Sequence, residues 1–130
     1  MKTRTTSSML WHAFAMASIL ILLSACGGDD SRLGSADTFV EISDSGVTRV
    51  IDQSTLYDLS ISGSGNTVSI AGNNRLNQFT ISGSNNIVTV LPGTTIAALT
   101  FSGADNTVNA PAGSIATKTD NGQGNNVIDL

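Results

Sequence analysis

Residues 81–90 read ISGSNNIVTV, and close versions of these words occur twenty positions earlier, as ISGSGNTVSI, and twenty positions later, as FSGADNTVNA. In each copy apolar residues alternate with Ser, Thr or Asn, which is typical of a strand with one buried face. Glycine, asparagine or aspartate interrupts every such run after a few residues. The sequence therefore predicts short strands that recur every twenty positions.

This repeat places chemically similar residues in columns twenty positions apart. The predicted corner residues of these columns are Gly63, Gly83, Gly103, Asn66, Asn86, Asn106 and Asn126. Columns that stay in phase require successive repeats to run in the same direction, because antiparallel neighbours would reverse the order of residues. The sequence therefore predicts an all-β fold, a parallel β-solenoid (β-helix) of about five coils, without indicating its handedness.

The glycine and asparagine columns are expected to be structural. A corner in a tight coil needs a positive φ or a close approach of stacked backbones, and glycine permits both. Asparagine tolerates the left-handed region, and amide side chains stacked one coil apart can form a hydrogen-bonded ladder. The same spacing aligns Leu56 with Ala116 at the two ends of one apolar column and places Ile128 and Leu130 in the interior.

Residues 1–25 are typical of a signal peptide, with Lys2 and Arg4 before an apolar run that is too short to span a bilayer. This run ends in LSAC, residues 23–26, which resembles the lipobox of bacterial lipoproteins. The resemblance implies cleavage after Ala25 and attachment of several acyl chains to Cys26, enough for a stable membrane anchor. The alternative is an ordinary secretory signal with an unrelated cysteine.

Gly27 follows the cysteine where enterobacterial lipoproteins retained at the inner membrane carry an aspartate. The lipoprotein resemblance therefore implies the outer membrane of the bacterial cell envelope, and leaves periplasmic and surface exposure open. The predicted domains are the signal peptide, residues 1–25, the lipidated Cys26 with a flexible glycine-rich tether, residues 26–36, and the solenoid, residues 37–130.

The charge of the mature chain limits its partners. Without residues 1–25, four basic and ten acidic residues give a net charge of −6. This balance argues against nucleic acid, because phosphate backbones are bound by basic patches. The expected partner is the membrane, through the acyl chains on Cys26.

The words SGSGNTVSI, SGSNNIVTV and SGADNTV resemble the repeats of the bacterial family called domain of unknown function 3060, over about residues 56–130. The resemblance implies an exported β-solenoid in the cell envelope, and it brings no activity and no catalytic residues. The chain departs from the family pattern in its first coil and again at DNGQG, residues 120–124.

Catalytic chemistry has little support in these residues. The mature chain has no His and no free thiol, which removes the usual activated nucleophiles and zinc sites, and no cofactor is predicted. We therefore expect a membrane-anchored, non-catalytic lipoprotein with a structural, adhesive or surface-binding role. The alternative is a carbohydrate-binding or carbohydrate-cleaving solenoid that uses Asp105, Asp120 and outward stripes of Ser and Thr. A single weak Ca²⁺ site near Asp105, or near Asp120 and Asp129, is a further alternative.

The sequence ends inside a predicted strand, residues 125–130, with no polar capping segment after it. Terminal coils normally need a cap over their open edge. We therefore expect the last coil to be covered by a partner or by end-to-end homo-association. The alternative is an exposed edge kept soluble by Asp129 and the terminal carboxylate.

Overall fold

The computed structural model describes residues 36–130, which form a parallel β-solenoid, and the predicted fold class is confirmed. The predicted signal peptide, Cys26 and the tether up to residue 35 lie outside the described residues. The described chain enters the solenoid at Asp37, whose backbone N–H donates to the carbonyl oxygen of Leu56 at 3.0 Å. Residues 36–130 contain no candidate for a membrane-spanning helix.

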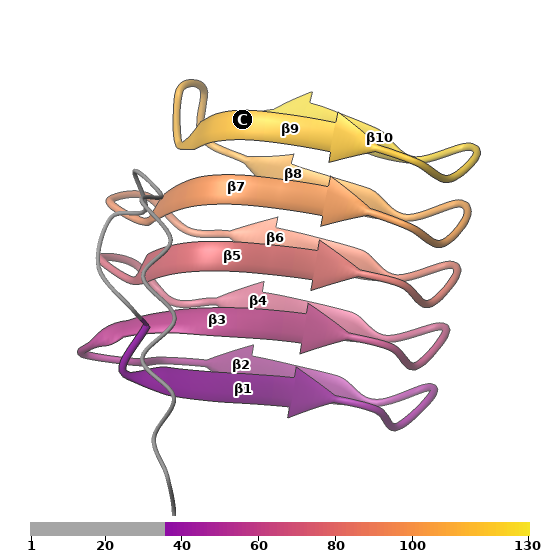
Figure 1. Cartoon of the computed structure of the whole chain (residues 1–130), viewed down its shortest axis with the longest axis horizontal. Helices are drawn as coiled ribbons and strands as arrows, with labels where there is room; N and C mark the ends of the chain where they lie inside the picture. Colours follow the sequence, from indigo (N-terminus) through magenta and orange to yellow (C-terminus); the bar gives the residue numbers. More distant parts are fainter. Residues whose placement is uncertain (1–35) are drawn as a thin grey trace, which may run out of the picture. The chain divides into compact units, whose positions relative to one another are not determined.

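Each of the five coils contributes one strand to each of two parallel sheets (Figure 1). Sheet A contains β1 (Thr38–Ile42), β3 (Leu56–Ile61), β5 (Arg75–Ile81), β7 (Thr95–Phe101) and β9 (Ile115–Asp120). Sheet B contains β2 (Thr48–Ile51), β4 (Thr67–Ile70), β6 (Ile87–Val90), β8 (Thr107–Ala110) and β10 (Asn126–Asp129). We call the turn from each sheet A strand to the sheet B strand that follows it in the chain the glycine corner. The turn from each sheet B strand back to sheet A is the opposite corner.

The coil is right-handed, a property that the sequence pattern did not indicate. In Figure 1 the near strands of sheet A run to the right, the fainter strands of sheet B run to the left, and the chain rises from β1 to β9. A connection between parallel strands of one sheet is almost always right-handed, because the twist of the strands favours that crossover. Each sheet B strand serves as part of such a crossover here.

The step from one coil to the next is twenty positions in the middle of the solenoid and nineteen at its ends. Thr67 pairs with Ile87 and Ile87 with Thr107, whereas Thr48 pairs with Thr67 and Thr107 pairs with Asn126. A constant spacing of twenty is therefore wrong for the first and last coils.

The twentieth position enters at a β-bulge in β5. Leu76 and Phe79 both point inward and are buried although they are three positions apart. Asn77 and Gln78 together oppose the single residue Asp58, which accepts hydrogen bonds from the Asn77 amide at 3.0 Å and from the Gln78 backbone at 2.9 Å. A bulge of this kind adds one residue without changing which face the flanking side chains occupy.

One residue is lost again at the start of β9. Ile115 pairs with Ile96, a step of nineteen. The expected apolar column with Leu56 and Ala116 at its ends is therefore wrong by one residue at both ends, where Tyr57 and Ile115 are the inward side chains.

The two sheets enclose a core of stacked apolar side chains. Full burial of one such side chain stabilises the fold by about 1.5–3 kcal/mol. The buried apolar residues are Ile42, Ile51, Tyr57, Leu59, Ile61, Val68, Ile70, Leu76, Phe79, Ile81, Val88, Val90, Ile96, Leu99, Phe101, Val108 and Ala110. None of them belongs to the last coil, which is therefore different in character from the four before it.

Candidate functional site

The glycines of the predicted corner allow stacked backbones to approach closely. A Cβ on Gly83 would overlap the carbonyl oxygen of Gly63, and one on Gly103 would overlap that of Gly83. Neither glycine has a positive φ, so close approach is the reason for glycine at this position. The positive φ angles occur two positions later, as at Asn85 (57°) and Asp105 (55°).

The buried asparagines of this corner form a continuous ladder. The Asn86 carbonyl oxygen accepts from the backbone N–H of Asn66 at 3.0 Å, and its amide group donates to the carbonyl oxygen of Gly63 at 3.0 Å. The same amide group also donates to the Asn106 side chain at 2.9 Å, and Asn106 donates in turn to the Asn125 side chain at 2.9 Å. The asparagine side chains thus supply hydrogen-bond partners for backbone N–H and C=O groups of the corner. Buried backbone groups need such partners.

Asn125, not the predicted Asn126, is the last member of this asparagine ladder. Asn126 instead pairs with Thr107 at the start of β10. Asp120 ends the ladder, because its carboxylate accepts from the Asn125 amide at 2.9 Å and from the backbone N–H of Gly122 at 2.9 Å. A signal for this was present in the sequence, since glycine and asparagine stand three positions apart in the second, third and fourth corners, and Gly122 with Asn125 keeps that spacing.

The shift of one residue reverses the inside and outside of the last coil. Side chains alternate along a strand, so a slip of one position exchanges the two faces. Ile128 and Leu130, expected in the interior, are 42% and 68% exposed. The residues that continue the interior columns of Leu99, Phe101 and Ala110 are Lys118, Asp120 and Asp129.

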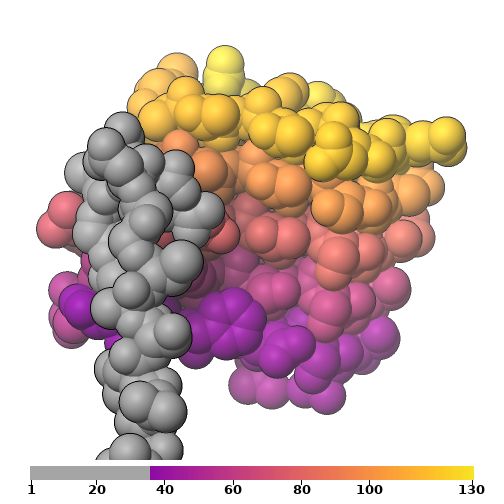
Figure 2. Space-filling model, viewed as in Figure 1, coloured from indigo at the N-terminus to yellow at the C-terminus, as the bar shows by residue number. Residues whose placement is uncertain are grey.

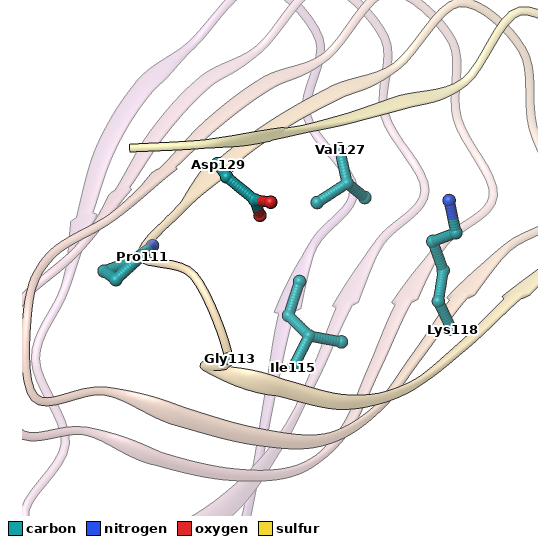
Figure 3. Close-up of a pocket in the computed structure, with 6 residues that line it drawn as sticks. All are labelled: Pro111, Gly113, Ile115, Lys118, Val127 and Asp129. Carbon is teal, nitrogen blue, oxygen red and sulfur yellow. The ribbon is translucent and has the colours of Figure 1, made fainter.

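Charged side chains at the inward positions of the last coil therefore form a polar cap, which a constant spacing of twenty places on the outside. Figure 3 shows Lys118 and Asp129 pointing into the space between the two strands of the last coil, with Ile115 and Val127 beside them. This open hollow has a volume of about 270 Å³. Charged side chains in line with an apolar core are a known way to protect an edge from pairing. End-to-end homo-association stays a prediction, but its premise of an apolar open end is wrong.

Asp105 and Asp120, the two carboxylates of the carbohydrate-directed alternative, lie in different surroundings. Asp105 stands at the positive-φ position of its corner, and its backbone N–H donates to the Gln123 carbonyl oxygen at 2.8 Å. Asp120 points inward and is bonded to Asn125, and no described hydrogen bond joins it to Asp105. Within residues 36–130 no group of three or more His, Cys, Asp or Glu side chains could hold a metal ion.

The outer face of sheet A carries the expected hydroxyl stripe, and the register extends it by one residue. Figure 2 shows this side of the solenoid as layers of side chains, one layer for each coil. The stripe consists of Ser60, Thr80, Thr100 and Thr119, where Thr119 replaces a position that the constant spacing assigns to Asp120. Glu41 continues it in the first coil, so the stripe is not uniformly neutral.

A second polar ladder at the opposite corner was missed by the sequence analysis. The Asn74 side chain accepts from the backbone N–H of Gln53 at 2.8 Å, and Thr94 accepts from the backbone N–H of Asn74 at 3.3 Å. The Thr94 hydroxyl donates to the carbonyl oxygen of Ala71 at 2.7 Å. The signal was a polar residue at the end of this turn in successive coils. Ser114 occupies this position in the next coil, but its buried hydroxyl has no hydrogen-bond partner among the described residues.

Tyr57 is a buried polar group without a partner. Its side chain is fully buried at the start of β3, and its hydroxyl has no hydrogen-bond partner among the described residues. Burial, and to a smaller extent the negative charge of Asp52, raise the pKa of the Tyr57 hydroxyl well above its ordinary range. The phenol therefore fills the core as a neutral group at physiological pH.

Comparison with known protein families gives one match. The model of the family described as "Protein of unknown function (DUF3060)" matches residues 61–126, which is just over half of the chain. The matched segment begins at the last residue of β3 and ends at the first residue of β10, so it covers the central coils of the solenoid. No curated protein and no solved structure matches the chain.

Proposed function

The chain belongs to the DUF3060 family, and from that premise we propose that it is a lipoprotein whose β-solenoid serves a non-catalytic, structural, adhesive or surface-binding role in the bacterial cell envelope. In this proposal the acyl chains on Cys26 hold the protein in a membrane, and residues 26–36 tether the solenoid to it. The outer membrane is the proposed location, following from Gly27 after the lipidated cysteine.

One observation carries the non-catalytic part of the proposal: the buried polar side chains are used to stack the coils. Asn66, Asn86 and Asn106 each bond a neighbouring coil through both ends of the amide, and Asn74 and Thr94 bond neighbouring coils at the opposite corner. Catalytic sites usually combine a cleft with convergent polar groups whose hydrogen bonds are free for a substrate. The hydrogen bonds found here are those of a scaffold.

The lipoprotein part of the proposal depends on Cys26 and is tested at that residue. The full chain is expressed in bacteria supplied with a radiolabelled fatty acid, next to a Cys26→Ala variant. We expect the natural chain to incorporate the radiolabelled fatty acid and to be recovered in the membrane fraction. The variant should do neither. Equal label in the two proteins, or none in either, would reject lipidation at Cys26, and an immunoblot for both proteins controls for expression.

The role of the solenoid depends on which side of the membrane it faces. An epitope tag inserted within residues 31–36 reports this by antibody labelling of intact and permeabilised cells. Labelling of intact cells supports adhesion or capture of an external ligand. Labelling only after permeabilisation supports a structural role inside the envelope and contradicts an adhesive one.

The carbohydrate-directed alternative is tested with Asp105→Asn and Asp120→Asn, which keep the size of each side chain. A carbohydrate-cleaving or carbohydrate-binding solenoid that works through these carboxylates would lose that function in the double variant. The proposed scaffold would keep its membrane location and its stability, apart from a small loss at the Asp120 bond to Asn125.

A further inference from the structure

The outer face of sheet B carries no charge. Its ten outward side chains, two from each strand of the described sheet, are Thr48, Val50, Thr67, Ser69, Ile87, Thr89, Thr107, Asn109, Asn126 and Ile128. Every one of them is aliphatic, a hydroxyl or an amide. Val50, Ile87 and Ile128 are 71%, 50% and 42% exposed, so three aliphatic side chains stand on this surface.

The rest of the described solenoid is acidic. Residues 36–130 contain eight acidic and three basic side chains, a net charge of 3 − 8 = −5. All eleven lie in sheet A, in the corners or at inward positions, as with Arg49 in β2 and Asp129 in β10. The outer face of sheet A, by contrast, includes Glu41 and Asp58. The neutral face is therefore the side on which two copies can approach without direct repulsion between like charges.

We propose that the outer face of sheet B pairs with the same face of a second copy of this chain in the membrane. The inference rests on the proposed membrane anchor. A twofold axis parallel to the solenoid puts equal coils at equal heights and leaves both N-termini at the same end, as two chains anchored in one membrane require. The same operation makes equivalent strands of the two copies run in opposite directions. The first outward residue of each strand therefore meets the second outward residue of the same strand in the second copy.

This pairing brings two polar side chains together in coils two and four, and an aliphatic side chain opposite a polar one in coils one, three and five. In coils two and four hydroxyl and amide groups meet, as Thr67 with Ser69 of the second copy. In coil three the aliphatic side chain of Ile87 meets the hydroxyl-bearing Thr89. Flat sheets that pack face to face interdigitate β-branched side chains of this kind at about 10 Å separation.

The size of the face makes the contact weak in free solution. Five coils about 4.8 Å apart and four residues of about 3.3 Å each cover roughly 300 Å² on each copy. Stable complexes bury about 800 Å² on each partner. Anchoring in one membrane raises the effective concentration of the copies, which compensates for a small contact without enlarging it.

Single cysteines test the pairing in the full chain, because Cys26 is its only natural cysteine. Thr89→Cys places a thiol in the middle of the proposed interface. Thr100→Cys is the matched control, since Thr100 is also a half-buried, outward threonine but lies in sheet A. Bacterial membranes containing each variant are treated with a short bis-maleimide, which joins two thiols by thioether bonds without an oxidant.

We expect dimers from Thr89→Cys and none above background from Thr100→Cys. Adding Ile87→Lys should lower the dimer yield by about tenfold or more, because an unpaired ammonium group would be buried in the contact. Thr80→Lys, the corresponding change on sheet A, should leave the yield unchanged and shows whether an added lysine disturbs the fold.

Equal cross-linking from both faces would overturn the pairing, and so would a dimer that Ile87→Lys does not affect. Protection of the Thr89→Cys thiol from a monofunctional maleimide without dimer formation would also overturn it, in favour of a different occupant. The natural chain distinguishes failure of the pairing from failure of the membrane anchor. If its Cys26 thiol is free, or if it is absent from the membrane fraction, the lipoprotein proposal itself is rejected.

Discussion

Asn86 shows how much a single side chain does in this fold. It is fully buried, accepts from one neighbouring coil and donates to the carbonyl oxygen of Gly63 and to Asn106. Asn109, in β8, lies half-buried on the outer face of sheet B. The two asparagines have the same chemistry but differ entirely in the number of groups that depend on them.

Asn86→Ala is therefore expected to lower the free energy of unfolding by about 2–6 kcal/mol, because two buried backbone groups lose their partners. Asn109→Ala is the matched control, and we expect a change of about 0.5 kcal/mol or less for that outer-face substitution. Urea denaturation followed by circular dichroism measures both. Similar losses for the two variants would contradict a structural ladder.

Tyr57 gives a prediction of the opposite sign. Its hydroxyl is buried without a partner among the described residues, so Tyr57→Phe should raise the free energy of unfolding by about 1 kcal/mol at neutral pH. The raised pKa of Tyr57 means that the fold favours the neutral phenol. Its contribution to stability is therefore fully present below the unfolded pKa of about 10 and is lost as the pH rises from there toward the folded pKa.

The advantage of Tyr57→Phe should consequently grow above a pH of about 10, measured as the difference between the two denaturation midpoints at several pH values. Tyr57 is the only tyrosine of the chain, so absorbance at alkaline pH follows its ionisation directly. A normal titration in the folded protein would contradict the burial of this hydroxyl.

At the scale of the strand, the bulge in β5 explains which parts of the fold could be predicted from the sequence. The alternation of Ile81, Val88 and Val90 with polar residues indicated strands, and the constant columns of the central coils indicated their parallel stacking. The residue added at Gln78 and the residue lost before Ile115 could not be located in the sequence, because the residues of this repeat are small and similar. A constant spacing therefore fails beyond these two positions, although the Gly-to-Asn spacing remains correct in every corner after the first.

Deleting Gln78 tests this account of the register. The second coil already has one residue at this position, Asp58, and it pairs with the bulged third coil. Removing Gln78 should shift the change from nineteen to twenty positions to the next coil. It should lower the free energy of unfolding by about 1–2 kcal/mol, mainly through the lost hydrogen bond to Asp58.

Deleting Thr80 is the control, because this residue is flanked by the buried Phe79 and Ile81 and its loss would turn one of them outward. We expect this variant to lose the cooperative thermal transition. If the two deletions have equal effects on thermal unfolding, the bulge is not the element that absorbs the extra residue.

Considered as a whole, the solenoid has a uniform middle and a distinct last coil. The four preceding coils contribute the buried apolar core, and the last coil replaces three of these inward positions by Lys118, Asp120 and Asp129. A continuous apolar column that opened to solvent would favour stacking of further coils. The charges at this end oppose that outcome.

Replacing Lys118 by Leu and Asp129 by Val should therefore promote association through the end of the solenoid. We expect a larger sedimentation coefficient at high protein concentration for this double variant than for the natural protein. Arg75→Leu with Glu41→Val makes the same change of charge at outward positions and serves as control. Association of the control to the same extent would show that any exchange of two charged side chains for apolar ones promotes assembly, wherever they lie, and would contradict a specific role of the cap.

The register of the central coils also has a consequence for the history of the molecule. Each of these coils is one unit of twenty positions that offers identical pairing groups to the coil on either side. Tandem duplication of the corresponding stretch of the gene would insert one further unit there, in phase, and would lengthen the solenoid by about 4.8 Å. Recombination can thus change the copy number of the unit while the same first and last coils are inherited.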